Sequence, residues 1–182
     1  QILNLIRDLQ AELKMALLLI THDLGVVANM AQTVVVMYHG RIVESGASPD
    51  LFSKPGHPYL RALFKAVPRF GMEPSERLVP VRTIEHELGE HFQAPSSVTA
   101  PGEPLLEVHH LCKTFAIRGT GLFRRSKSTE VKAVDDVSFS IQRGECLGLV
   151  GESGCGKTTV SKILMRALSP DSGSVQFHDQ GQ

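Results

Sequence analysis

One octapeptide in the last third of the chain contains residue types that can bind phosphate. Residues 151–158 read Gly-Glu-Ser-Gly-Cys-Gly-Lys-Thr, which matches the pattern G-x-x-x-x-G-K-S/T in full. Glycines let successive backbone N–H groups turn toward one anion without a Cβ clash. Lys157 can reach the outer phosphates of a nucleoside triphosphate, and the Thr158 hydroxyl can ligate a bridging Mg²⁺ ion. The octapeptide therefore predicts a nucleoside triphosphate site.

The segments on either side of the octapeptide fit this chemistry. Cys146–Val150 is a short apolar run, typical of a buried strand, and it leads directly into the first glycine. Residues 157–168 have a helical pattern, so the positive end of a helix dipole would face the same anion. A glycine-rich turn with a chance lysine is the alternative, and this strand and helix weigh against it. The predicted nucleotide contacts are Gly151, Glu152, Ser153, Gly154, Cys155, Gly156, Lys157, Thr158 and Thr159.

The three cysteines, Cys112, Cys146 and Cys155, form no CxxC pair. A structural zinc site therefore has no support, and an odd number of scattered thiols fits a reducing compartment. Cys155 lies inside the octapeptide, where a small filler residue is the favoured interpretation. A thiol with a pKa lowered by the helix N-terminus is the alternative.

The chain divides into three parts by its patterns. Residues 1–68 alternate helical and strand patterns, residues 69–104 are rich in proline and lose periodicity, and strand patterns resume at residue 105. In the first part we expect a helix over 1–14, a strand over 16–21, a helix over 23–30, strands over 33–39 and 41–44, a helix capped by Ser48, and a helix over 57–67. In the last part we expect strands over 105–115, 131–141, 146–150 and 173–177, an insertion over 119–132, and the helix over 157–168.

This order of motifs resembles an ABC-transporter nucleotide-binding domain. Asp135–Phe139, Arg143–Glu145 and the octapeptide resemble that family's approach to its phosphate loop, and Ser172-Gly173 fits the continuation. The resemblance implies that the nucleotide is ATP and that Thr158 is a Mg²⁺ ligand. Phe115 stands where the family places an aromatic residue that stacks on adenine. A structural aromatic at the end of a strand is the alternative.

The first part of the chain resembles the end of another copy of the same domain. Ile20–Asp23 follows a buried strand as the family's switch histidine does, so His22 would contact the γ-phosphate and position the attacking water. A histidine without a catalytic role is the alternative. Pro55–Tyr59 and the residues after it resemble the C-terminal extension of oligopeptide, dipeptide and nickel importer ATPases. We expect that extension to be structural, packed behind the catalytic domain.

The resemblance implies a partial α/β P-loop NTPase fold in two pieces. Residues 1–68 would end a first ABC domain, residues 69–104 would be a linker, and residues 105–182 would begin a second domain, as in tandem two-domain ATPases of this group. The family's glutamine loop, LSGGQ-type signature and Asp-Glu strand are missing from the sequence. We therefore expect an internal fragment with incomplete ATP sites and no efficient turnover, in which His22 and Lys157 serve different sites. Strands such as 16–21 and 146–150 would lack neighbours.

For the parent protein, the resemblance implies ATP hydrolysis that energises import of peptides or peptide-like solutes (glutathione, dipeptide, oligopeptide). Its partners would be integral-membrane permease subunits, a solute-binding protein and the second ABC domain, and it would lie peripherally on the cytoplasmic face of the inner membrane. The formal net charge is zero, which argues against a nucleic-acid partner. A truncated remnant that at most binds nucleotide, and a soluble non-transport ABC ATPase, are the alternatives.

Overall fold

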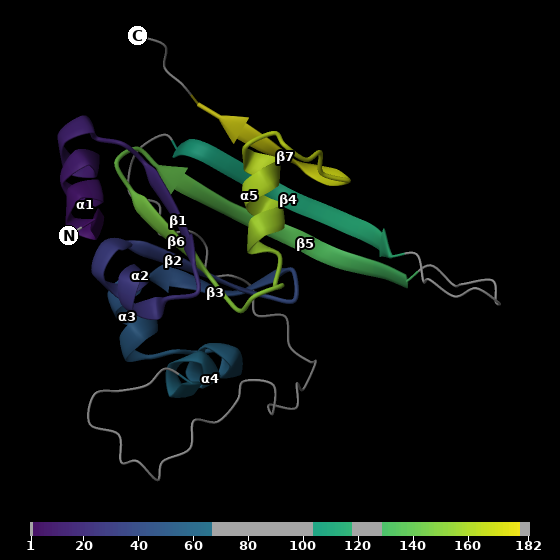
Figure 1. Cartoon of the computed structure of the whole chain (residues 1–182), viewed down its shortest axis with the longest axis horizontal. Helices are drawn as coiled ribbons and strands as arrows, with labels where there is room; N and C mark the ends of the chain where they lie inside the picture. Colours follow the sequence, from purple (N-terminus) through teal and green to yellow (C-terminus); the bar gives the residue numbers. More distant parts are fainter. Residues whose placement is uncertain (1, 67–103, 118–128, 179–182) are drawn as a thin grey trace.

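A computed structural model describes residues 2–66, 104–117 and 129–178 of the chain, which form two sheets and five helices (Figure 1). The elements in chain order are α1 (Ile2–Leu13), β1 (Leu17–Thr21), α2 (Leu24–Met30), β2 (Thr33–Tyr38), β3 (Arg41–Ala47), α3 (Ser48–Ser53), α4 (Pro58–Ala66), β4 (Pro104–Ile117), β5 (Thr129–Gln142), β6 (Cys146–Val150), α5 (Lys157–Leu164) and β7 (Ser172–Phe177). The predicted linker, apart from Pro104, and residues 119–128 of the predicted insertion lie outside the described residues.

The first sheet joins strands from both ends of the chain. Its order is β1-β6-β2-β3, in which β6 runs parallel to β1 and to β2, and β2 is antiparallel to β3. The expectation that β6 would lack neighbours is therefore wrong, because Gly148 pairs with Leu19 on one side and with Val34 on the other. The outer edge of β1 has no strand partner among the described residues.

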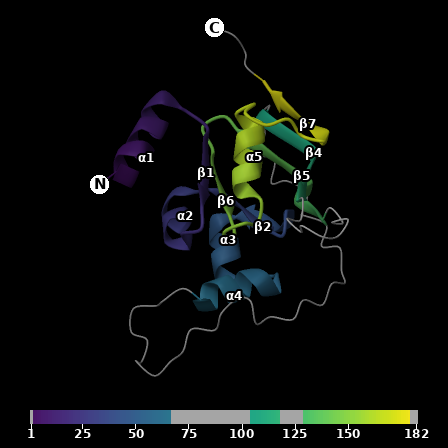
Figure 2. The ribbon, with the colours of Figure 1, turned by 45° about the vertical axis from the view of Figure 1, so that its right-hand side comes forward.

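The second sheet is antiparallel and has the order β5-β4-β7. Both views show α5 lying against this sheet (Figures 1 and 2). Val160 and Ile163 of α5 are buried in one apolar cluster with Val108 and Leu111 of β4. The long strands β4 and β5 thus provide a surface against which the helix after the octapeptide is packed.

Alternating side chains of the first sheet enter two different cores. Val34 and Val36 of β2 pack with the helices α2, α3 and α4, whereas Val35 and Met37 pack with α5 and the second sheet. This alternation follows from the two-residue period of a strand. The first sheet is therefore covered on both faces, which explains the continuous apolar sequence of β2.

The helix α2 shows how closely the layers approach. It begins after Asp23, whose Oδ1 accepts hydrogen bonds from the N–H groups of Gly25 (2.9 Å) and Val26 (3.2 Å). It then crosses β6 at Gly148, where an added Cβ would lie 2.8 Å from a Val27 methyl group. The missing side chain at Gly148 is what allows this helix to pack against the central strand.

Several element boundaries differ from the expected ones, three of them in an informative way. Ala47, not Ser48, is the N-cap residue of α3, and it makes no side-chain cap hydrogen bond. The strand β3 continues to Ala47 because its residues from Glu44 to Ala47 pair with β2. The helix α5 ends at Leu164 rather than near residue 168, and Arg166 just beyond it adopts a positive φ of 57° that does not continue a helix.

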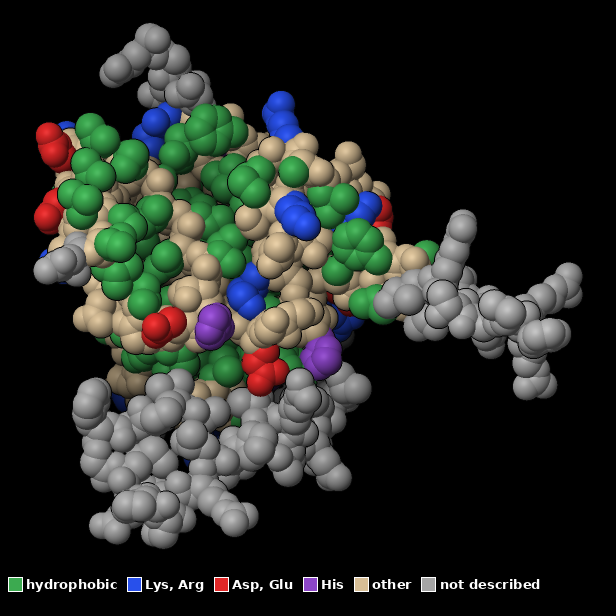
Figure 3. Space-filling model, in the orientation of Figure 1, with side chains coloured by type: hydrophobic (Ala, Val, Ile, Leu, Met, Phe, Trp, Pro, Cys, Tyr) green, Lys and Arg blue, Asp and Glu red, His purple; other side chains and the backbone are tan. Residues whose placement is uncertain are grey.

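The apolar stripe expected on the first helix exists but is largely exposed. Ile6 packs against the core, whereas Ile2, Leu5, Leu9 and Leu13 are exposed. The space-filling view shows hydrophobic side chains gathered at the end of the molecule where α1 lies (Figure 3). Among the described helices, none is long and apolar enough to cross a membrane.

Candidate functional site: the phosphate-binding loop

The loop after β6 has the backbone shape that its glycines predict. Gly151 and Gly156 have φ angles of 152° and 108°, in a region that residues with a side chain rarely adopt. A Cβ at Gly151 would collide with the Met37 carbonyl oxygen, and one at Gly156 with the Ala133 carbonyl oxygen. Both positions therefore require glycine for conformation and for space.

The Lys157 ammonium group is held by the loop itself. Its Nζ donates to the carbonyl oxygens of Gly151 (2.8 Å) and Glu152 (2.7 Å) and lies 3.5 Å from Cys155 Sγ. The lysine is partly buried, so its charge is presented at the loop rather than in bulk water. Such a charge can exchange carbonyl partners for phosphate oxygens when an anion arrives.

The N-terminus of α5 provides the second half of an anion site. Lys157 is the first residue of α5, and its N-cap, Gly156, has no side chain to cap the first turn. The N–H groups of the first turn have no partner within a helix, so they remain suited to an anion. Thr158 is exposed at this end of the helix and Thr159 is half-buried beside it.

The tip and the wall of the loop differ in exposure. Ser153 and Gly154 are exposed, and no atom lies within 4 Å of a Cβ built at Gly154. Cys155 is buried in the core shared by α5 and the second sheet. The buried thiol supports the interpretation of Cys155 as a filler whose backbone carries the function.

Two contacts that hold the loop were not expected from the sequence. The N–H of Gly40, in the turn between β2 and β3, donates to the Cys155 carbonyl (2.9 Å), and the Gly40 carbonyl accepts from the N–H of Asp135 (2.8 Å). The Glu152 N–H donates to the Tyr59 hydroxyl of α4 (2.8 Å). The expected strands over 33–39 and 41–44 imply a turn at Gly40, but no spacing rule relates that turn or Tyr59 to the octapeptide.

The structure brings His22 to the same edge of the sheet as the loop. Thr21 and Val150 are paired at the ends of two parallel strands, so His22 and Gly151 follow neighbouring strand ends. His22 is exposed there, and the Thr21 hydroxyl and the Asp23 side chain fix the turn around it. The strand of the first part thus pairs with a strand of the last part, whereas the assignment of His22 and Lys157 to different ATP sites stays a prediction.

Phe115 lies near the end of β4, opposite Val131 of β5. The phenyl ring is 41% exposed, and Lys113 Nζ lies 5.8 Å from the ring centroid. An aromatic face that is open to solvent can stack on a nucleotide base. Val131 is two residues before Ala133, whose carbonyl borders Gly156, so this end of the second sheet also adjoins the loop.

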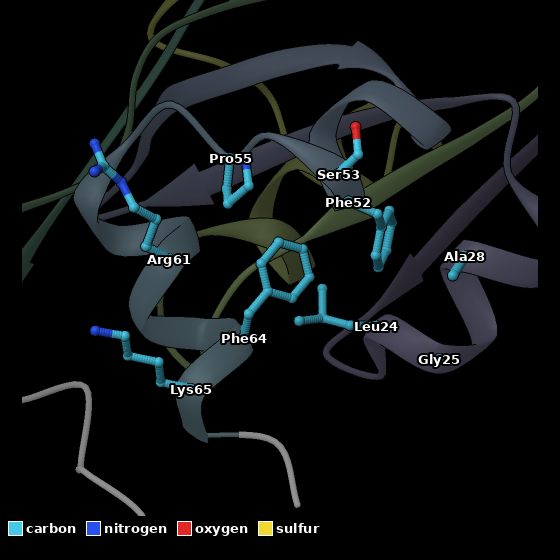
Figure 4. Close-up of a pocket in the computed structure, with 9 residues that line it drawn as sticks. All are labelled: Leu24, Gly25, Ala28, Phe52, Ser53, Pro55, Arg61, Phe64 and Lys65. Atoms are coloured by element: carbon cyan, nitrogen blue, oxygen red, sulfur yellow. The ribbon is translucent and has the colours of Figure 1, made fainter. Parts of the chain in front are cut away.

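A shallow depression lies on the opposite side of the first sheet from the second sheet and α5. It is bordered by residues of α2, α3 and α4 and has a volume of about 490 Å³ (Figure 4). Leu24, Phe52 and Phe64 form its apolar floor, and Arg61 and Lys65 stand at its rim. None of the predicted nucleotide contacts borders it.

A known protein family matches the part of the sequence that contains the loop. Residues 134–181 match the family model described as ABC transporter, and this match includes the end of β5, the whole loop and α5. This part of the chain is therefore similar to the ABC transporter family, as its motifs suggested.

The similarity to individual relatives extends over nearly the whole chain. Over 99% of its length the chain is 42% identical to the glutathione import ATP-binding protein GsiA of Escherichia coli strain K12, and equally to that of Shigella flexneri. The chain spans 29% of the length of these relatives.

Proposed function

We propose that residues 151–159 bind MgATP, and that in a longer protein this binding serves ATP hydrolysis coupled to import of a peptide or peptide-like solute. The observation that carries the proposal is the position of Lys157, whose ammonium lies inside a glycine loop at the uncapped start of α5. The relatives named for glutathione import support the solute class, with glutathione, dipeptides and oligopeptides as candidates.

The residues of the loop fit a nucleotide. Gly151 and Gly156 allow the backbone turns that shape the loop, Lys157 supplies a positive charge, and first-turn N–H groups of α5 supply donors. The exposed Thr158 hydroxyl would hold Mg²⁺ together with phosphate oxygens, and the ion would neutralise phosphate charge. Phe115 would stack on the adenine. His22 would contact the γ-phosphate and position water at the ATP site of the first domain.

Nucleotide binding without turnover is a second candidate function. The sequence contains no LSGGQ-type signature and no apolar strand that ends in Asp-Glu. A general base for the attacking water would therefore have to come from outside these residues. Under this alternative the chain binds MgATP through Lys157 but releases no phosphate.

The proposed setting is a multi-subunit importer. Residues 1–68 and 105–182 would belong to two ABC domains joined by a linker over 69–104, and permease subunits and a solute-binding protein would complete the complex. The protein would lie at the cytoplasmic face of the inner membrane. The relatives named as import ATP-binding proteins support this setting.

The test compares Lys157→Ala with Lys162→Ala, a matched change at an exposed position of the same helix. We expect Lys157→Ala to weaken MgATP binding at least about tenfold in calorimetry, because a charge-assisted contact is worth roughly 1.5–3 kcal/mol. Lys162→Ala should bind as the wild type does. Equal binding by all three proteins would refute the site. If the wild type releases phosphate and Lys157→Ala does not, the second candidate function, nucleotide binding without turnover, is refuted.

A further inference from the structure

A tyrosine distant in sequence contacts the backbone of the phosphate-binding loop. Tyr59 of α4 is 93 residues before Glu152, and its hydroxyl accepts the hydrogen bond from the Glu152 N–H at 2.8 Å. The tyrosine is 1% exposed, so water does not compete for this contact. The bond reaches the loop from the side of the helices that cover the opposite face of the first sheet.

The contacted peptide group also holds the lysine. The peptide between Gly151 and Glu152 is trans, so its N–H and its C=O point in opposite directions. The N–H points to Tyr59, and the Gly151 carbonyl on the other side accepts from Lys157 Nζ at 2.8 Å. The hydroxyl bound at one edge of the peptide group therefore influences where the carbonyl at the opposite edge points.

The conformation of Gly151 explains why the orientation of this peptide group needs a fixed hydrogen-bond partner. Its φ of 152° lies in a region that only glycine visits readily, and glycine puts little restraint on rotation of the adjoining peptide plane. Without a partner for the Glu152 N–H, the plane can rotate and carry the Gly151 carbonyl away from the lysine. The tyrosine hydroxyl is the partner that opposes this rotation.

Tyr59 is itself fixed from two directions. Its ring packs on Tyr38 of β2, with centroids 4.2 Å apart and planes tilted by 40°. The start of α4 is tied to β3, because the Glu44 carboxylate accepts from the N–H groups of Gly56 (2.8 Å) and His57 (2.9 Å). Burial raises the pKa of Tyr59, so its hydroxyl stays protonated throughout the physiological range.

We propose that Tyr59 is a positioning residue of the phosphate-binding loop. By accepting a hydrogen bond from the Glu152 N–H, Tyr59 directs the Gly151 carbonyl toward Lys157. The effect of this contact on MgATP binding rests on the proposed function, whereas the contact between Tyr59 and the loop does not. The helix α4 is thereby assigned a direct part in shaping the phosphate site, beyond the packing role expected for it.

The test is Tyr59→Phe, which keeps the ring and removes the hydroxyl, with Tyr38→Phe as the matched control from the same ring pair. In the nucleotide-free chain, we expect hydrogen exchange of the Glu152 amide to accelerate at least about fivefold in Tyr59→Phe only, since a hydrogen bond is worth roughly 1 kcal/mol. Lys157 should also be acylated faster than in the wild type, relative to Lys162 in the same sample. MgATP affinity should fall about three- to tenfold.

Two outcomes would overturn the proposal. In one, Tyr59→Phe leaves both the Glu152 exchange and the Lys157 acylation at wild-type rates. In the other, exchange accelerates throughout the chain, which is the mark of general destabilisation. If the two local changes occur but the wild type binds no MgATP, the role of Tyr59 in the loop stands and the proposed function fails.

Discussion

Replacement of Gly40 by alanine tests whether the turn between β2 and β3 rests on the strand β5. Gly40 has a φ of 83°, and a Cβ there would lie 3.0 Å from the Ala133 carbonyl oxygen and 3.1 Å from that of Lys132. These obstacles are backbone atoms, which cannot turn aside as a flexible side chain can. Gly154 is the matched control, because its φ is 86° and nothing lies within 4 Å of the added Cβ.

The two substitutions share one cost and differ in another. A left-handed conformation costs a residue with a Cβ about 1–2 kcal/mol, and both variants incur it. Gly40→Ala also crowds a packed site, which typically costs about 1–3 kcal/mol. We therefore expect Gly40→Ala to lower the free energy of unfolding by roughly 2–5 kcal/mol and Gly154→Ala by roughly 1–2 kcal/mol.

Equilibrium unfolding in urea measures this difference, with circular dichroism and fluorescence as independent probes of one transition. The two variants should have similar m-values, so that the shift in midpoint reports stability. If Gly40→Ala and Gly154→Ala are destabilised equally, within about 0.5 kcal/mol, then Gly40 does not lie against Ala133. The turn between β2 and β3 would then not contact β5.

Three further perturbations address other contacts. Burial would raise the pKa of Asp135, but its hydrogen bond to Arg41 and the charge of Arg41 outweigh burial and lower that pKa. The resulting stability is present above about pH 4 and is lost as the pH falls through the lowered value. Arg41→Ala should therefore cost up to about 1 kcal/mol at pH 7, because Arg41 is 61% exposed, and less in urea titrations at pH 3. Gly148→Ala should cost about 1–3 kcal/mol in the same assay, because its Cβ would meet Val27 at 2.8 Å, and an unchanged midpoint would contradict the packing of α2. Cys155 is buried, so it should be alkylated slowly, and more slowly still with MgATP, as mass spectrometry of the labelled chain can determine.

The local parts of the fold could be predicted from the sequence because their causes are local. The apolar run before Gly151 and the helical pattern after it gave the strand and helix that flank the loop. Asp23 signalled the start of α2, and its carboxylate does cap that helix. Each of these features depends on residues within one or two turns of each other.

The pairing of strands could not be predicted in the same way. The apolar sequences of β1, β2 and β6 show that each is buried, but burial on both faces does not specify a neighbour. The insertion of β6 between β1 and β2 depends on contacts between residues more than a hundred positions apart, such as the Gln32 side chain with the Cys146 N–H. For the same reason the sequence did not indicate that His22 and Gly151 would follow neighbouring strand ends.

The surroundings of the candidate site were missed for a related physical reason. Tyr59 and Gly40 reach the loop through a single hydrogen bond each, and neither bond imposes a pattern on the residues around it. The periodicity of α1 similarly predicted a helix but not its exposure, because a stripe of leucines does not reveal which surface it meets.

The central position of β6 also has a consequence for the order of events during synthesis. Gln32, beside β2, and Cys146, at the start of β6, are separated by 114 residues. At about 5–20 residues per second, a ribosome would need roughly 6–23 s to make the strand that fills the gap between β1 and β2. The early strands therefore emerge with unpaired backbone edges and uncovered apolar faces, and the slow closure of such distant parallel pairings makes this the interval in which the nascent chain is most open to aggregation.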